Sequence, residues 1–180
     1  YYDGGEYAEL VSDPDRDIHY HNACLFGIHE RGKEIPKLTR DLSKRLIYCV
    51  LYGGGAKKTG SIIAPKESEH KQYEKGKQTI DTFYQNLPAI KKLKDQVEST
   101  LSNRDYLIGI DGRHLQIRSK HSALNQLLQS TGAITVKKAT TILYDDMTDK
   151  GLKFFKDWGF VAHVHDEYQC LLRPEYTDLF

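Results

Sequence analysis

Four residues spaced four apart, Arg40, Lys44, Tyr48 and Tyr52, form a pattern that could bind an anionic ligand carrying a flat ring. In a helix this spacing keeps them on one slowly rotating face, and the helix dipole favours negative charge near the two cations. The segment from Arg40 to Tyr48 covers about 12 Å at 1.5 Å per residue. A ligand with phosphates at one end and an aromatic base at the other matches this order. The pattern also fits a solvated basic face with two half-buried tyrosines.

The second chemical signal is His165-Asp166-Glu167, which lies between two apolar runs and so predicts the turn of a hairpin. Hard cations such as Mg2+ prefer carboxylate oxygens, and two-metal phosphoryl transfer needs them at a fixed separation. An ordinary polar turn is one alternative. A zinc site at His163 and His165 is another, although the HxHxDH arrangement of zinc hydrolases is absent. The YDD run at 144–146 ends a helical pattern and predicts a solvated helix end.

The composition predicts that the chain folds and that it resides in a reducing compartment. Its 180 residues, 39% hydrophobic and 28% charged, suffice for the core of one average domain. No apolar run approaches the ~18 residues of a membrane span, and the start lacks the basic-then-apolar pattern of a signal peptide. Three scattered cysteines fit neither a disulfide framework nor a CxxC metal knuckle, which favours the cytosol.

The net charge of +1 conceals an uneven distribution. Residues 31–140 carry a net charge of +11, whereas residues 1–30 and 141–180 carry −6 and −4. Such asymmetry can create an anion-binding surface beside a cluster of carboxylates. The chain also opens on Tyr1 without a methionine, and we expect it to be a piece of a longer protein.

Hydrophobic periodicity predicts both helices and hairpins. Helices are expected over residues 17–30, 40–52, 65–86, 88–101 and 121–148. Asp17 is the expected N-cap of the first and Thr39 of the second, which glycines 53–55 should end. Hairpins are expected for 106–110 with 113–117, around Asp111-Gly112, and for 160–164 with 168–172. Helices with separate hairpins predict the α+β class.

Two of these motifs together resemble those of family A DNA polymerases. The run R-x3-K-x3-Y-x3-Y-G at 40–53 is similar to the family's fingers-helix motif, and His-Asp-Glu at 165–167 is similar to its third palm motif. The further runs GEYA, DIH, DGR and RS-x-H-x-ALN-x-LLQS-x-GA, together with HDE, resemble the bacteriophage branch. The resemblance covers almost the whole chain. It implies an incomplete right-hand polymerase fold, with fingers over residues 1–105 and part of an antiparallel palm sheet over residues 106–180.

The resemblance also implies roles for the nucleotide-binding residues. Arg40 and Lys44 would hold the incoming triphosphate, and Lys44 would protonate the departing pyrophosphate. His19, in the DIH run, would contact the phosphates. Tyr48 would pack beside the incoming sugar and base, and Tyr52 beside the template base.

The same resemblance assigns the acidic turn to catalysis. Asp166 would bind metal as a catalytic aspartate, Glu167 would lie near the primer end, and His165 beside the primer backbone. The family's first metal-binding aspartate is expected upstream of Tyr1. The isolated chain is therefore expected to be inactive.

Besides His165, three residues of the segment 121–148 are expected to face the minor groove of the DNA. Asn125 and Gln129 lie one helical turn apart, and amide side chains reach the minor-groove acceptors that all base pairs share. His121, one turn earlier, stands where many family members have arginine. Without the resemblance, an exposed helix face is the favoured explanation of the two amides.

We therefore expect the parent protein to be a DNA-directed DNA polymerase of DNA replication, extending a primer with two Mg2+ ions. Its expected partners are primer–template DNA and dNTPs, without a membrane, and whether a processivity factor also binds is not readable from this segment. The expected location is the cytoplasm, that of the host if the source is a phage. The alternatives are a nucleic-acid or nucleotide-binding module that is inactive on its own, and a metal-dependent hydrolase.

Overall fold

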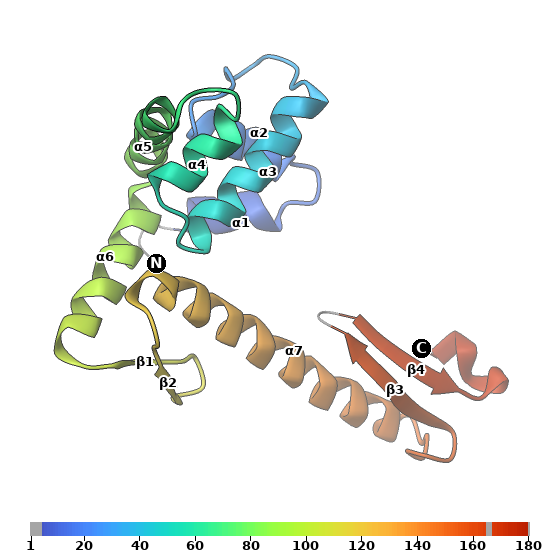
Figure 1. Cartoon of the computed structure of the whole chain (residues 1–180). Coiled ribbons are helices and arrows are strands. Elements are labelled where there is room, and N and C mark those ends of the chain that lie inside the picture. Colours follow the sequence, from blue (N-terminus) through green and yellow to red (C-terminus); the bar gives the residue numbers. More distant parts are fainter. Residues whose placement is uncertain (1–4, 165–166, 180) are drawn as a thin grey trace. The chain divides into compact units, whose positions relative to one another are not determined.

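The computed structural model describes residues 5–164 and 167–179, and the chain divides into two compact units, residues 1–128 and 129–180 (Figure 1). The first unit contains α1 (Glu6–Ser12), α2 (Ile18–Leu25), α3 (Lys37–Leu51), α4 (Ala56–Ile63), α5 (Glu69–Asn86), α6 (Pro88–Asn103), β1 (Tyr106–Ile108), β2 (His114–Gln116) and the short 3-10 helix η1 (Lys120–Ser122). The second contains β3 (Trp158–Val164), β4 (Glu167–Leu172) and η2 (Pro174–Leu179), and α7 (Ala123–Asp149) runs from the first unit into the second. The α+β class is confirmed. The fingers–palm boundary at residue 105 stays a prediction.

Helix α2 begins as its sequence predicts but ends earlier. The Asp17 side chain caps it by accepting hydrogen bonds from the backbone N–H groups of His19 and Tyr20. The prediction of a helix to residue 30 was wrong, because the chain turns at Gly27, whose φ of 70° is readily adopted by glycine. Ile28 then packs against the core from outside the helix.

Helix α3 starts one turn before the predicted start. Its N-cap is Pro36, not Thr39, and Lys37 is its first residue. The backbone N–H of Arg40 donates to the carbonyl of Pro36 at 3.0 Å, which is the first α-helical hydrogen bond, from residue i to residue i−4, of this helix. The proline has no N–H to leave unpaired at this end, so it fits here.

Helix α4 was not predicted, and it crosses α5 at very short range. A Cβ on Gly60 would lie 1.6 Å from the Gln72 carbonyl oxygen, and one on Gly76 would lie 1.9 Å from that of Ala56. Only glycine permits this approach, so both positions are required for the crossing. Helix α5 begins at Glu69 after its N-cap Ser68, later than the predicted residue 65.

The first unit has two hydrophobic clusters. The larger joins α2, α3 and α5 through Leu25, Phe26, Leu46, Ile47, Val50, Phe83 and Leu87. The apolar residues of α3 recur at helical spacing, and Leu46, Cys49 and Val50 among them are buried. The smaller cluster joins α6, β1 and the start of α7 through Val97, Leu101, Leu107 and Ala123. Burying one side of α3 in this way leaves its other side for ligands.

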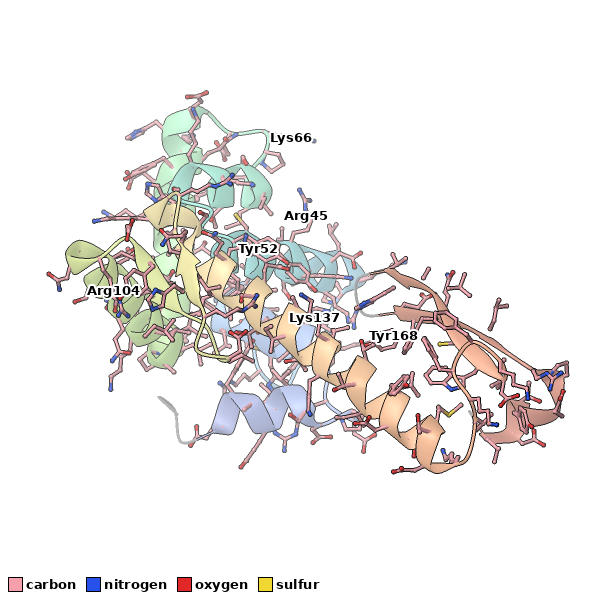
Figure 2. The ribbon with its side chains drawn as sticks, turned by 90° about the horizontal axis from the view of Figure 1, so that it is seen from below. Arg45, Tyr52, Lys66, Arg104, Lys137 and Tyr168 are labelled. Carbon is pink, nitrogen blue, oxygen red and sulfur yellow. The ribbon has the colours of Figure 1, made fainter. Side chains whose placement is uncertain are left out.

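The second unit is a hairpin packed on the end of α7. Strands β3 and β4 pair antiparallel from Trp158↔Leu172 to Val164↔Glu167, with an irregularity in register between Phe160 and Ala162. Tyr168 ties β4 to α7 by donating to the carbonyl of Val136 and accepting from the Thr140 hydroxyl at 3.0 Å (Figure 2). No helix in the described part of the chain is both long and apolar enough to cross a membrane.

Candidate functional site

The outer face of α3 presents the predicted residues to solvent. Tyr48 and Tyr52 retain 46% and 49% of their surface although both are aromatic, and Arg40 and Lys44 are also exposed. The tyrosine ring centroids lie 5.8 Å apart with 32° between the ring planes. Tyr52 and the exposed cation Arg45 of α3 are labelled in Figure 2. The structure therefore brings these four predicted residues onto one accessible face.

Helix α2 adds His19 to this face. Its Nδ1 is shielded from solvent and finds no hydrogen-bond partner among the described residues. Burial lowers the pKa of His19, and so do the positive charges of Arg40 and Lys44, while Asp17 and Asp41 raise it by less. If an anion binds beside neutral His19 and the two cations, its negative charge stabilises this arrangement.

Asp17 and Ser43 hold α2 against α3. The Asp17 Oδ2 accepts a 2.8 Å hydrogen bond from Arg40 Nε, and the buried Ser43 hydroxyl donates to the His19 carbonyl at 2.6 Å. Burial raises the pKa of Asp17, but the hydrogen bonds from Arg40 and from the α2 backbone outweigh it and leave the pKa below its usual value. From the sequence, only a capping role is expected for Asp17. Its ion pair joins residues 23 apart, and no local pattern signals it.

His121 lies against the C-terminal end of α3. Gly53, whose φ is 79°, follows Tyr52, and a Cβ there would lie 2.0 Å from the His121 carbonyl oxygen. Gly53 and His121 line a cavity of about 280 Å³, together with side chains that include Lys94, Lys120 and Glu98. The structure thus places one predicted DNA-facing residue next to the α3 C-terminus. No pattern in the sequence predicts this contact between His121 and Gly53.

The other predicted DNA-facing residues lie on α7. Asn125 is half-buried in the first unit, and its Oδ1 is shielded without a hydrogen-bond partner among the described residues. Gln129 is exposed and is the first residue of the second unit. Both lie on the predicted helix, which is confirmed, and their roles remain predictions.

The acidic turn is only partly described. His165 and Asp166 lie outside the described residues. Glu167 is exposed at the start of β4, where its Oε1 accepts a 3.3 Å hydrogen bond from Gln169. His163 on β3 contacts the Tyr168 ring, with centroids 4.7 Å apart. Within the part of the chain that the structure describes, no three or more His, Cys, Asp or Glu side chains gather as a metal site.

Comparison with known proteins decides the family. The model of "DNA polymerase family A" matches residues 8–178, nearly the whole chain. This chain belongs to DNA polymerase family A. The resemblance seen in the sequence is confirmed.

Relatives of this family A chain include phage and bacterial enzymes. The chain is 34% identical to the DNA-directed DNA polymerase of Enterobacteria phage T3 and 35% identical to that of Escherichia phage T7, in each case over 97% of the chain and 25% of the relative. It is 26% identical to DNA polymerase I of Aquifex aeolicus (strain VF5), over 89% of the chain and 29% of the relative. The chain thus spans about a quarter of the length of the phage polymerases that it matches.

A solved structure shares the fold of this chain. The POL domain of Pol1 from M. smegmatis, in complex with DNA primer-template and dNTP, superimposes with a TM-score of 0.75 at 19% identity. The match covers 91% of this chain and 29% of that structure's chain. This likeness confirms an incomplete polymerase fold.

Proposed function

We propose that the intact protein containing this chain is a DNA-directed DNA polymerase that adds dNTPs to a primer 3′ end. The chain itself supplies the fingers and part of the palm. The observation that carries this proposal is the exposed face of α3 with its two cations, its tyrosine pair and His19 alongside, in a chain of family A.

The residues of α2 and α3 would orient the incoming nucleotide. Arg40, Lys44 and His19 would bind the triphosphate, since charge-assisted hydrogen bonds to phosphate are strong and directional. The rings of Tyr48 and Tyr52 would bound the space for the base pair that forms. Lys44, a flexible point charge with three donors, would deliver a proton to the departing pyrophosphate.

Asp166 and Glu167 would serve the reacting end of the primer. Their carboxylate oxygens suit Mg2+, and Glu167 is accessible at the start of β4. Two Mg2+ ions, when bound, would neutralise charge on the phosphoryl group and activate the attacking oxygen. Asp166 is the proposed metal ligand of this chain, together with an aspartate expected upstream of Tyr1. No observation favours the zinc hydrolase alternative.

The start of α7 would check the shape of the primer–template. His121, Asn125 and Gln129 would face the minor groove, and His165 would lie by the primer backbone. The minor-groove acceptors occupy similar positions in every base pair, so amide donors can test geometry without reading sequence. We place the intact enzyme in the cytoplasm, that of the host if the source is a phage.

A direct test compares the intact protein with the isolated 180-residue chain, each supplied with primer–template, dNTPs and Mg2+. We expect extension by the intact protein and none by the chain alone. Extension by the isolated chain would contradict our assignment of a required aspartate elsewhere. Failure of the intact protein to extend a primer, with nucleotide binding retained, would favour the binding-module alternative.

His19 gives a pH-dependent prediction. Because its pKa is lowered, His19 is neutral at pH 8, and a bound triphosphate would favour its protonation. As the pH falls from 8 to 6, the dNTP KM of the wild-type polymerase should therefore decrease relative to that of the His19→Gln variant. Uptake of one proton limits the difference to about tenfold per pH unit. The neighbouring His21→Gln is the control and should follow the wild-type profile. Parallel profiles for wild type and His19→Gln would contradict the role.

A further inference from the structure

The Asp17 carboxylate makes contacts on two helices at once. Its Oδ1 accepts hydrogen bonds from the backbone N–H groups of His19 at 2.9 Å and Tyr20 at 3.3 Å. Its Oδ2 accepts from Arg40 Nε at 2.8 Å. One oxygen therefore fixes the beginning of α2, and the other fixes a guanidinium on α3.

This use of Nε determines how Arg40 can meet a ligand. A guanidinium has five N–H donors in a fixed planar fork, and holding Nε leaves the four on Nη1 and Nη2 for other acceptors. Arg40 is otherwise a long side chain with 44% of its surface exposed, so it would sample many rotamers. The ion pair restricts that freedom before any ligand binds.

We infer that Asp17 is a positioning residue, which holds Arg40 and the start of α2 in register so that Arg40 and His19 meet the nucleotide triphosphate together. Asp17 acts through Arg40 and does not touch the nucleotide. The inference rests on the proposed function. The hydrogen bond from Ser43 to the His19 carbonyl is a second tie between the same helices.

Electrostatic repulsion alone predicts the opposite role for Asp17, that of weakening triphosphate binding. Asp17 carries a negative charge close to a site for a polyanion, so its removal should tighten triphosphate binding if repulsion dominates. If positioning dominates, removal should weaken binding. The sign of the change therefore distinguishes the two effects.

The test compares Asp17→Asn with Asp41→Asn in the intact polymerase, measuring kcat and dNTP KM separately. Asparagine is as good an N-cap as aspartate, but when its oxygen caps α2 its NH2 faces Arg40 and cannot accept a hydrogen bond. Asp41 is exposed on α3, and its negative charge raises the pKa of Arg40 without a hydrogen bond between them. It therefore serves as the matched control. We expect Asp17→Asn to raise the dNTP KM about tenfold, the loss of one charge-assisted hydrogen bond. Asp41→Asn should change the KM less than about twofold.

An unchanged or lower KM for Asp17→Asn would overturn the inference. Asp17→Ser, which also caps a helix but presents no carboxylate to Arg40, should reproduce the increase. This second variant shows that the effect does not come from the asparagine itself.

An Arg40→Ala background separates this inference from the proposed function. If Asp17 acts through Arg40, Asp17→Asn should add no further increase in KM there. An equal increase in both backgrounds would assign Asp17 a general structural role and overturn the inference alone. If Arg40→Ala itself leaves the dNTP KM unchanged, the proposed triphosphate role of Arg40 fails instead.

Discussion

Replacing Lys44 with alanine is expected to lower the rate of single-nucleotide incorporation by the intact polymerase about 1,000-fold, within the range for loss of a general acid. Lys44 is exposed on α3 at the proposed triphosphate site and forms no ion pair with any described residue. Its ammonium is therefore available to the triphosphate. A rapid-quench measurement at saturating dNTP isolates this effect from a change in affinity.

The matched control is Arg45→Ala, which removes a positive charge one residue further along α3. Consecutive residues of a helix point about 100° apart, so the exposed side chain of Arg45 points in a different direction from that of Lys44. We expect its incorporation rate to stay within about threefold of wild type. Equal losses for the two variants would show that general positive charge, and not Lys44 itself, supports the reaction.

Asp166→Asn is expected to lower the incorporation rate at least about 1,000-fold, because a divalent cation needs the carboxylate charge and contributes several kcal/mol to phosphoryl transfer. The residue lies outside the described part of the chain, between Val164 of β3 and Glu167 of β4, which pair with each other. The flanking strands are hydrogen-bonded, so an isosteric substitution should leave the hairpin intact. The same rapid-quench assay measures the loss.

Asp145→Asn is the control for this variant. Asp145 is an exposed acid on α7 in the same unit, in the YDD run that we interpret as a solvated helix end. Its substitution should leave incorporation within about twofold of wild type. If the polymerase loses activity with Asp145→Asn and keeps it with Asp166→Asn, our assignment of the metal ligand to Asp166 is contradicted.

Local signals predicted the segments whose physics is local. The core stripe of α3 follows from its helical spacing, and the Asp17 cap follows from a side chain that reaches its own helix N-terminus. The β3–β4 hairpin follows from two apolar runs around polar residues. The start of α3 was misplaced because Thr39 is a common cap, whereas the chain uses the rarer Pro36.

Helix α4 could not be predicted because glycines 53–55 directly before it, together with Gly60 inside it, are typical of a loop. Gly60 weakens the propensity of a short helix, and the compensation is close packing against α5 at Gly76. That gain depends on a neighbour that only the folded chain brings near. Tertiary packing of this kind is invisible to a local pattern.

The candidate site divides in the same way. The spacing of Arg40 and Lys44 placed both on one face, as the structure has them. The ion pair of Asp17 with Arg40 and the contact of His121 with Gly53 join segments far apart in the chain. Neither has a periodic signal, because each depends on how the elements pack together.

The most direct test of the account is equilibrium binding of the correct dNTP to the intact polymerase on a primer–template ending in a dideoxynucleotide, where binding occurs without reaction. We predict that Arg40→Ala and Lys44→Ala each raise the dNTP Kd at least about tenfold, the loss of one charge-assisted contact, while Arg45→Ala stays near wild type. Equal Kd values for wild type, Arg40→Ala and Lys44→Ala would contradict the claim that this face of α3 binds the triphosphate.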